Sequence, residues 1–598
     1  AAPAPNGAGA GLVFAAEGRK NLRRARAYEI KLFNFSGVAY RRGIIMELCE
    51  AKQPLTSICA DIRSFKINRT DNPPPHYAPT HSWHFRLTKR GFLTKGVEID
   101  IDLNLQYAKE HIKMKRSSGI LLPLFSLPSP YGIGTIASAK SFLNYLSACN
   151  QKYWQILPLG PTGCSNSPYQ TYSAFACDPI YIDPGELLKA GLISPDEEAA
   201  AHLPETKKVD YAAVRASRDQ LFRLAYSRCD KSEVTKFLKK EPELNDYCLF
   251  MAIKDSLGGA PLSEWPEDIR LRESSALLHY SQNLHEDMLY HGFLQLEFRR
   301  QWADMRQIAD SLGIGIIGDI PMYVSADSAD FWSHPSLFMT DEKGDPTDVA
   351  GVPPDYFSES GQLWGNPLYD YAAMKKDGYK WWKKRVRHEL EFCDILRIDH
   401  FRGFSEFWAV PAGEEDASNG RWIKGPGMKL VSAIMSAGGK DCFIAEDLGI
   451  LSDDARALIE KSGLPGMKIL EFAFDTLAPS DYQPHRYPTN CVAYTGTHDN
   501  NTSMGWMGEI SESVRRYAVK YLALNADEGW HIGMIRALYA SNAQLVIIPL
   551  QDYIGMDSDG RINTPSTVEG NWLLRIPGEL LSEKLAQTAS ALVKMYER

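Results

Sequence analysis

Short runs of β-forming residues alternate with amphipathic stretches from residue 117 to the C-terminus. Strands favour β-branched and aromatic residues, whereas an amphipathic helix repeats its apolar residues every three to four positions. This alternation is typical of a parallel α/β fold. The β-type runs cover residues 119–124, 153–159, 313–320, 395–401, 442–448, 468–474, 491–497 and 544–550. Eight runs favour a (β/α)8 TIM barrel, with a doubly wound sheet as the alternative.

Helical periodicity fills most intervals between these runs. The predicted helices cover residues 137–149, 292–312, 379–392, 429–437, 453–461, 512–524, 530–539 and about 579–596. The interval after the second run is too long for one crossover, and it contains helical patterns at 211–226 and 244–257. We therefore predict a barrel domain over residues 117–598, with a mostly helical insertion at about 162–291 and loop subdomains over the barrel mouth.

Residues 1–116 have a different composition from the rest of the chain. They carry 20 Lys and Arg against 10 Asp and Glu, whereas the remaining residues carry 46 against 64. A basic N-terminal region resembles an organelle transit segment, although this one is poor in serine. The acidic body argues against nucleic acid or an anionic membrane as a partner, because both require a clustered basic face.

Three further features limit the class of protein. No apolar run approaches the roughly 18 residues that a membrane span requires. The ten cysteines form no C-x-x-C pair, so neither a zinc ribbon nor a disulfide framework is indicated. Gly313, Gly315 and Gly318 match the dinucleotide fingerprint, but a helix precedes them and Asp319-Ile320-Pro321 follows, which is the wrong context. We expect no metal and no cofactor, and we expect these glycines to keep the third strand slim.

The candidate chemistry lies in three acids, Asp399, Glu446 and Asp499, that stand about fifty positions apart and each follow an apolar run. One strand with its crossover occupies roughly 30 or more residues, so the acids fall on different strands. A single acid at a strand end is often only a cap or an ion-pair partner. Three at corresponding positions favour a catalytic group, because a buried charge is costly unless it is paired or used.

The neighbours of these acids suggest separate roles. Arg397 points to the same side of its strand as Asp399, so we expect it to keep Asp399 ionised, as a nucleophile requires. Glu446 has no adjacent base, so burial and nearby carboxylates should raise its pKa, which suits a general acid. Retaining glycosyl transfer uses such a pair of carboxyl groups. His498 stands beside Asp499.

Aromatic and amide side chains crowd the candidate loops, a mixture that suits an open groove for a sugar. Flat rings offer a surface to the apolar faces of a sugar, while amides and carboxylates bond its hydroxyls. We interpret Trp381 and Trp382, on a predicted helix, as core residues. The candidate binding residues are Tyr169, Tyr172 and Phe175 after the second run, and Asp355, Tyr356, Phe357, Gln362, Trp364 and Asn366 in the 353–367 loop.

Six ordered motifs resemble the 4-α-glucanotransferases of glycoside hydrolase family 77, which are the bacterial amylomaltases and the disproportionating enzyme (D-enzyme) of plastids. The resemblance begins near residue 117 and continues to the C-terminus. The motifs are Ser167-Pro168-Tyr169-Gln170, Gly318-Asp319-Ile320-Pro321, residues 354–367 from Pro354-Asp355-Tyr356-Phe357 to Gly365-Asn366-Pro367, Arg397-Ile398-Asp399-His400-Phe401-Arg402-Gly403, Ala445-Glu446-Asp447-Leu448-Gly449 and Gly496-Thr497-His498-Asp499-Asn500.

The resemblance implies a barrel of the α-amylase superfamily that transfers segments of α-1,4-glucan between malto-oligosaccharide or starch chains and releases glucose from maltotriose. It implies that Asp399 is the nucleophile, Glu446 the acid/base and Asp499 the transition-state stabiliser. Asn501 stands where the family commonly has an acid. The substrate-binding positions that the resemblance supplies are Arg397, His498, Tyr169, Asp319, Asp355, Tyr356, Phe357, Gln362, Trp364 and Asn563. Together with the basic N-terminus it suggests a plastid location, with the cytoplasm as the alternative, and a monomer or homodimer.

Two other classes stay open from the residues alone. An enolase-type metal enzyme would also place acids such as Asp319, Asp399 and Glu446 on consecutive strands, with His498 as a base. A non-catalytic glucan-binding protein would explain the aromatic residues but has no need of the three acids. A hydrolase could use the same acids, and only the resemblance favours a sugar acceptor over water.

Overall fold

A computed structural model describes residues 11–14, 28–32, 46–50, 115–163, 165–354, 358–475 and 477–598. The chain divides into two compact units, Ala1–Lys109 and Glu110–Arg598. In the first unit, strands β1 (Gly11–Phe14), β2 (Tyr28–Leu32) and β3 (Met46–Glu50) form an antiparallel sheet in the order β1-β2-β3. Most of the basic segment that resembles a transit sequence lies outside the described residues.

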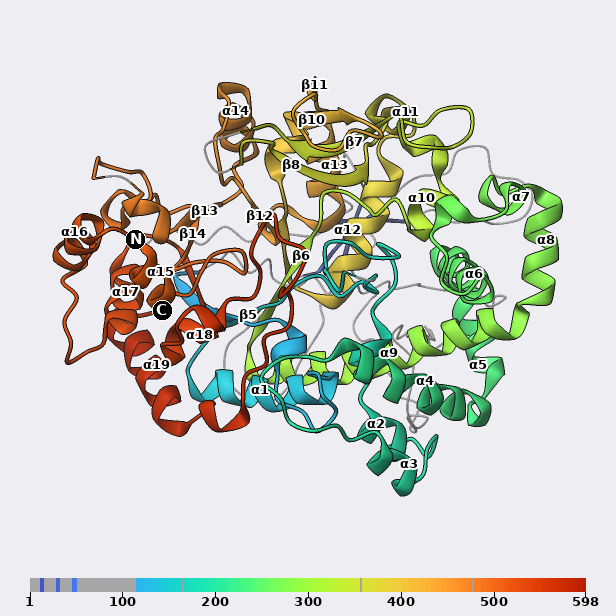
Figure 1. The fold of residues 1–598 in the computed structure, drawn as a ribbon, viewed down its shortest axis with the longest axis horizontal. Coiled ribbons are helices and arrows are strands. Elements are labelled where there is room, and N and C mark those ends of the chain that lie inside the picture. The colour runs from blue at the N-terminus through green and yellow to red at the C-terminus, as the bar shows by residue number, and fades with distance from the viewer. Residues whose placement is uncertain are drawn as a thin grey trace. The chain divides into compact units, whose positions relative to one another are not determined.

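The second unit is built on eight parallel strands, of which β5, β6 and β12 are labelled near the centre of Figure 1. They are β4 (Ser117–Leu121), β5 (Tyr153–Gln155), β6 (Gly315–Ile320), β9 (Ile395–Ile398), β12 (Phe443–Ala445), β13 (Gly466–Ile469), β14 (Cys491–Tyr494) and β15 (Leu545–Pro549). Neighbouring strands pair in chain order, and β15 pairs with β4. Between β12 and β13 the Ala445 amide donates to the Pro465 carbonyl at 2.9 Å, which brings the sheet round into a barrel. The predicted (β/α)8 barrel is therefore confirmed.

The glycines of the G-x-G-x-x-G match have structural roles. Gly313 ends helix α9 (His285–Leu312) in the left-handed conformation, at φ 65°. A Cβ on Gly315 would lie 2.8 Å from the Tyr153 ring, and one on Gly318 would lie 2.9 Å from Cys393 Sγ. Larger residues would force β6 away from its neighbours, so Gly315 and Gly318 keep the third strand slim, as predicted, whereas Gly313 serves as the cap of α9.

Helices cover the outside of the barrel. Each predicted helix is present, and most of the predicted ends lie within a few residues of the observed ends. Besides α9, the long helices between strands are α1 (Ile136–Ala148), α12 (Lys380–Phe392), α13 (Met428–Gly438), α14 (Asp453–Ser462), α16 (Glu512–Leu522) and α17 (Trp530–Ala540), and α19 (Glu583–Tyr596) follows the last strand. The short ones are α10 (Ala329–Ser333), α11 (Tyr371–Lys376), α15 (Ser503–Glu509) and α18 (Leu550–Ile554). Helix α9 begins seven residues before its predicted start, and Glu286 and Asp287 in its first turn complement the helix dipole.

A helical insertion follows β5 and lies to one side of the barrel, with α16–α19 on the opposite side in Figure 1. It contains α2 (Pro184–Lys189), α3 (Pro195–Ala200), α4 (Tyr211–Arg228), α5 (Lys231–Leu238), α6 (Pro242–Ser256), α7 (Glu267–Arg270) and α8 (Ser274–Asn283). None of the helices in the described part of the chain combines the length and apolarity needed to cross a bilayer.

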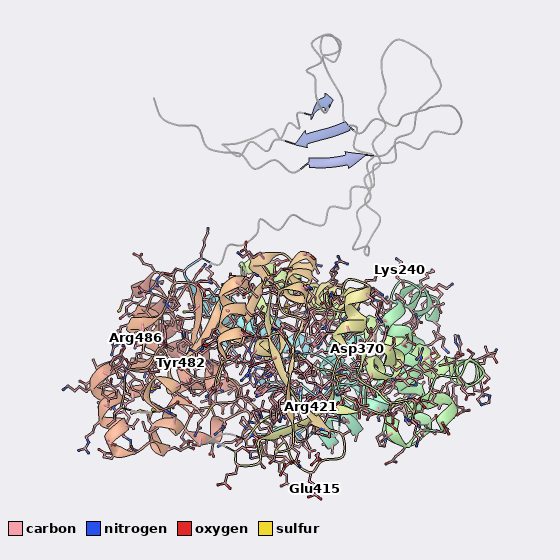
Figure 2. The ribbon with its side chains drawn as sticks, turned by 90° about the horizontal axis from the view of Figure 1, so that it is seen from above. Lys240, Asp370, Glu415, Arg421, Tyr482 and Arg486 are labelled. Atoms are coloured by element: carbon pink, nitrogen blue, oxygen red, sulfur yellow. The ribbon has the colours of Figure 1, made fainter. Side chains whose placement is uncertain are left out.

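A second, antiparallel sheet was not predicted. Strands β7 (Asp348–Val352), β8 (Gln362–Pro367), β10 (Glu406–Pro411) and β11 (Arg421–Lys424) form it in the order β11-β10-β7-β8. The loop expected over residues 353–367 instead contains β8, which forms because it pairs with β7. Figure 2 shows Arg421 and Glu415, from the β10–β11 hairpin, towards one edge of the second unit.

Candidate active site

Acidic side chains from four barrel strands meet at one end of the barrel, where parallel strands present their carboxyl ends. Asp319 lies in β6, while Asp399 and Glu446 lie one residue beyond β9 and β12. The Asp399 amide donates to Ile320 O at 3.1 Å, and the Glu446 amide donates to Ile398 O at 3.0 Å. These backbone bonds extend the barrel ladder, so the two acids are held on adjacent strands rather than on free loops.

Arg397 joins two of these carboxylates. Its Nη1 donates to Asp399 Oδ1 at 3.0 Å and to Asp319 at 2.9 and 2.7 Å. The Arg397 and Asp319 side chains are 4% and 0% exposed, so the ion pair is almost dry. Arg397 and Asp319 are also register partners on β9 and β6. The expected contact between Arg397 and Asp399 is present, but the guanidinium is shared with a second acid.

Sharing Arg397 changes the expected charge state of Asp399. Burial raises the pKa of Asp399 to about 6, since it outweighs the opposing effect of Arg397 and is reinforced by Asp319 and Asp499. Arg397 lowers the pKa of Asp399, in the expected direction, but burial and the two neighbouring carboxylates outweigh it. Asp399 is half ionised near pH 6 and largely an anion at neutral pH.

Glu446 is held by backbone amides. The His400 amide donates to Oε2 at 2.8 Å and the Leu448 amide to Oε1 at 2.7 Å. Burial raises the pKa of Glu446 to about 7; Arg397 opposes this rise and the Asp399 carboxylate adds to it. Glu446 therefore holds a proton more firmly than Asp399 does, in the direction that the sequence predicted.

Asp499 is in the opposite electrostatic situation. Its Oδ2 lies 3.2 Å from His498 Nε2, and its Oδ1 accepts from Asn563 Nδ2 at 2.6 Å. Burial raises the pKa of Asp499, but His498 and Asn563 outweigh it and lower the pKa to about 2. Conversely, burial lowers the pKa of His498, but Asp499 raises it above its ordinary value. Asp499 is an anion throughout the neutral range.

Tyr169 contacts both the Asp319 carboxylate and the His498 ring. Its hydroxyl donates to Asp319 Oδ2 at 2.8 Å and lies 3.0 Å from His498 Nε2. Its ring stacks on His498 with centroids 5.3 Å apart, and both rings pack against Trp572 at 5.9 and 6.0 Å. An aromatic wall thus stands next to Asp499, of the kind that binds the apolar face of a sugar.

Comparison with known proteins identifies the family. The family model of 4-alpha-glucanotransferase matches residues 122–581. The 4-alpha-glucanotransferase of Clostridium butyricum is 42% identical over 481 residues, which cover 79% of this chain and 99% of that protein. The chain belongs to the 4-alpha-glucanotransferase family.

A plant protein and a solved bacterial structure are also similar to this chain. The chloroplastic/amyloplastic 4-alpha-glucanotransferase of Solanum tuberosum is 39% identical over 514 residues, covering 83% of this chain and 88% of that protein. The structure of an amylomaltase from Streptococcus agalactiae in complex with acarbose superposes with a TM-score of 0.79 at 38% identity, covering 81% of this chain and all of that one. Bacterial and plastid members are thus similarly close to this chain.

A second aromatic group lies beside the acid pair. The Trp364 ring on β8 meets the His400 ring edge-on at 4.9 Å, and its Nε1 donates to Gln362 Oε1 at 3.2 Å. Gln170 Nε2 donates to Asn366 Oδ1 at 3.1 Å, so the loop after β5 is hydrogen-bonded to strand β8. The predicted residues Asp355, Tyr356 and Phe357 lie outside the described residues.

Not every predicted aromatic residue lies in the site. Phe175 is buried in the core against Trp381, and Trp382 is also buried, as expected of the helix that carries both tryptophans. Tyr172 packs against Phe250 of the helical insertion instead of joining the Tyr169 group.

Three residues that shape the site were not predicted from the sequence. Trp572 completes the aromatic wall, Arg561 Nη2 donates to the Asp499 carbonyl at 2.8 Å, and the His400 amide binds Glu446. Burial lowers the pKa of His400 to about 3, so its ring is neutral. His400 stands next to Asp399 in a quoted motif, which was an available signal; Arg561 and Trp572 carry no local signal.

Proposed function

We propose that this chain transfers segments of α-1,4-glucan between malto-oligosaccharide or starch chains by a retaining double displacement. The observation that carries the proposal is a pair of acids on adjacent strands. Asp399 accepts from Arg397, whereas Glu446 accepts from two backbone amides and has the higher pKa of the two. Between about pH 6 and 7 the pair holds one anion and one proton, which is what a nucleophile and an acid need.

In the first displacement, a carboxylate oxygen of Asp399 attacks the anomeric carbon of the donor. Glu446 gives its proton to the departing glycosidic oxygen, so the bond to the leaving chain breaks as the ester to Asp399 forms. The leaving chain departs with a free 4-hydroxyl, and Glu446 becomes a carboxylate.

In the second displacement, Glu446 accepts the proton of the 4-hydroxyl of an acceptor sugar. The acceptor oxygen attacks the anomeric carbon and Asp399 leaves as a carboxylate, which restores both acids and the original α configuration. When maltotriose is the donor and a maltosyl unit moves, the leaving group is glucose.

The remaining side chains have supporting roles in this proposal. Asp499, an anion with its own donors, binds two donor hydroxyls and opposes the positive charge that develops on the sugar ring. Arg397 and Asp319 fix the orientation of Asp399, while Tyr169, His498 and Asn563 shape the donor site. Gln362 and Trp364 line the glucan path, and the resemblance adds Asp355, Tyr356 and Phe357 to it.

The enolase-type alternative fits the geometry poorly. Asp319 and Asp399 both accept hydrogen bonds from Arg397, so their negative charge is already partnered by a guanidinium. A divalent cation at these two acids would have to displace that guanidinium or share them with it. The family membership also favours glycosyl transfer.

The test is a product analysis with maltotriose as the only substrate. Transfer conserves the number of reducing ends, whereas hydrolysis adds one for each bond cleaved. We expect glucose and a ladder of longer maltodextrins with a constant total of reducing ends, and a matching loss of glucose release when excess glucose is added. A total that rises in step with glucose would show that water is the acceptor and would overturn the proposal.

A location in plastids is a separate proposal. It is supported by the similarity to the Solanum tuberosum protein, which is described as chloroplastic/amyloplastic, and by the basic composition of residues 1–116. We expect residues 1–116 fused to a fluorescent protein to direct it into isolated plastids with cleavage of the leader. Retention outside the plastid would favour the cytoplasm. Sedimentation would decide between a monomer and a homodimer, the two states that we expect.

A further inference from the structure

A partly exposed tryptophan lies outside the residues assigned above. Trp422 belongs to β11, at the edge of the antiparallel sheet, and is 43% exposed. The guanidinium carbon of Arg402 lies over the Trp422 ring, 4.5 Å from the ring centroid. The Trp408 ring meets it edge-on with centroids 5.2 Å apart. The Trp422 ring is therefore supported by protein on two sides while a large part of it faces solvent.

Arg402 connects this ring to the catalytic strands. Its Nη1 donates to Ile450 O at 2.6 Å and its Nη2 to Glu406 at 3.0 Å, and its side chain is 16% exposed. Arg402 follows Asp399 by three residues, and Ile450 follows Glu446 by four. Three residues span at most about 10 Å, so Arg402 lies close to the proposed nucleophile.

Backbone bonds hold the hairpin in the same place. The Gly425 amide, just beyond β11, donates to Ser405 O at 2.7 Å, and the Gly427 amide donates to Phe404 O at 2.8 Å. The segment that follows Asp399 thus contacts the Trp422 ring through Arg402, and it is hydrogen-bonded to the residues just beyond β11. The ring has a fixed position relative to the Asp399 and Glu446 segments.

The position of the Trp422 ring places it on one side of the glycosidic bond that is cleaved. In the proposed mechanism Glu446 protonates the leaving oxygen, so the segments after β12 lie on the leaving-group side, which the acceptor enters next. The donor-side wall of Tyr169, His498 and Trp572 comes from segments after β5, β14 and β15 instead. In the barrel order, β9 and β12 are separated from β14 by β13.

We infer that Trp422, supported by Arg402, is a stacking subsite for the acceptor glucan beyond its first glucose unit. The ring offers a flat apolar surface to the C–H face of a sugar. Because Arg402 already fixes the ring, little side-chain entropy is lost on binding. The inference rests on the proposed function, since it assigns a residue to the acceptor of that reaction.

Trp422 also has a structural explanation that the test must separate. Trp408 and Trp422 are register partners on β10 and β11, and such cross-strand aromatic pairs stabilise a hairpin. A purely structural Trp422 would influence all acceptors equally, through the stability of the hairpin. A stacking subsite would influence only acceptors long enough to reach the ring.

The experiment measures transfer from a fixed concentration of amylose, followed by loss of iodine staining, to either glucose or maltotriose as the acceptor. In Trp422→Ala we expect the KM for maltotriose to rise about tenfold, the factor that corresponds to one weak aromatic contact, and the KM for glucose to stay within about twofold of wild type. Trp422→Phe should keep part of the preference for maltotriose because it keeps a ring. The control is Leu278→Ala on α8, which removes another exposed apolar side chain, 58% exposed, far along the chain from Asp399.

The outcomes separate the inference from the proposed function. Equal rises in KM for glucose and maltotriose, accompanied by a lower Tm, would assign Trp422 to the hairpin alone and overturn the inference. Unchanged KM values for both acceptors would overturn it as well. Failure of the wild-type chain to transfer to any acceptor would instead refute the proposed function.

Discussion

Two parts of the barrel mouth shift the pKa of their acids in opposite directions: the segments after β9 and β12 (the β9–β12 sector) and the segment after β14 (the β14 sector). Glu446 after β12 accepts from two backbone amides, and burial raises its pKa to about 7. Asp499 after β14 has His498 and Asn563 as side-chain donors, which outweigh burial and lower its pKa to about 2. Both acids follow a buried strand, so position in the fold does not set their charge. The donors that reach each carboxylate do.

Asp399 is intermediate between these two. Arg397 opposes the effect of burial but is shared with Asp319, and the pKa of Asp399 rises only to about 6. The site therefore holds a graded series of Asp499, Asp399 and Glu446 in order of increasing pKa. This order matches the roles of stabiliser, nucleophile and acid that we propose.

The largest expected effect comes from removing the nucleophile. Asp399→Asn should lower transfer from maltotriose by about 10⁴-fold or more, because the covalent step is lost while the fold is kept. The measurement is glucose release together with a thermal melt. Asp454→Asn, on an exposed aspartate of α14, is the matched control and should retain wild-type rates. A near-normal rate in Asp399→Asn would remove the whole β9–β12 sector from the mechanism.

A slightly smaller effect is expected from Glu446→Gln, at about 10³-fold, in the range of general acid–base catalysis. The readout that distinguishes an acid/base from a structural residue is chemical rescue. An activated donor such as maltosyl fluoride needs no proton on its leaving group, and azide needs no base to attack. We expect the two together to restore turnover and to yield an α-glycosyl azide. No rescue in a correctly folded variant would argue against this role.

His498→Asn tests the β14 sector. Loss of the His498 donor should raise the pKa of Asp499 from about 2 and misplace its carboxylate, lowering kcat/KM by about 10²-fold, the usual effect of one stabilising donor. His485→Asn, at an exposed histidine bonded to Tyr521, is the control. A loss confined to KM would indicate that this sector only binds the ground state.

The contrast in pKa also predicts the pH profile. The rate should rise as Asp399 loses its proton near pH 6 and fall as Glu446 loses its proton near pH 7, giving a narrow bell in kcat/KM. The two apparent values belong to the pair, because the carboxyl groups interact. Asp499 should add no limb above pH 5, since its pKa is about 2. A flat rate from pH 5 to 9 would contradict the graded series.

The smallest effect concerns stability. The pKa of Glu446 is raised in the folded protein, so its contribution to stability is complete below its ordinary value of 4.5 and is lost as the pH rises through about 7. Glu446→Gln cannot ionise, so we expect its Tm to match wild type near pH 4 and to exceed it by about 2 °C at pH 8. A variant that melts below wild type at pH 8 would show that ionised Glu446 does not destabilise the folded protein at that pH.

The barrel was predictable because its signals are local. The barrel strands are short runs of three to six residues that are mostly apolar, and the crossover helices carry their own periodicity, with caps such as Thr135 before α1. Strand β8 was missed because its pairing with β7 comes from the fold, while Gly365 and Pro367 give a local loop signature.

The sequence by itself determined which side chains end the strands: Asp399, Glu446 and the pair His498-Asp499 are set by chain position, because parallel strands present their carboxyl ends on one face. Only the tertiary structure decided which donors reach them. Arg397 meets Asp319 through strand register, and Asn563 reaches Asp499 across 64 residues of chain. Since the pKa of a buried acid depends on the groups within a few ångströms, its charge is a property of the packed barrel and not of the motif.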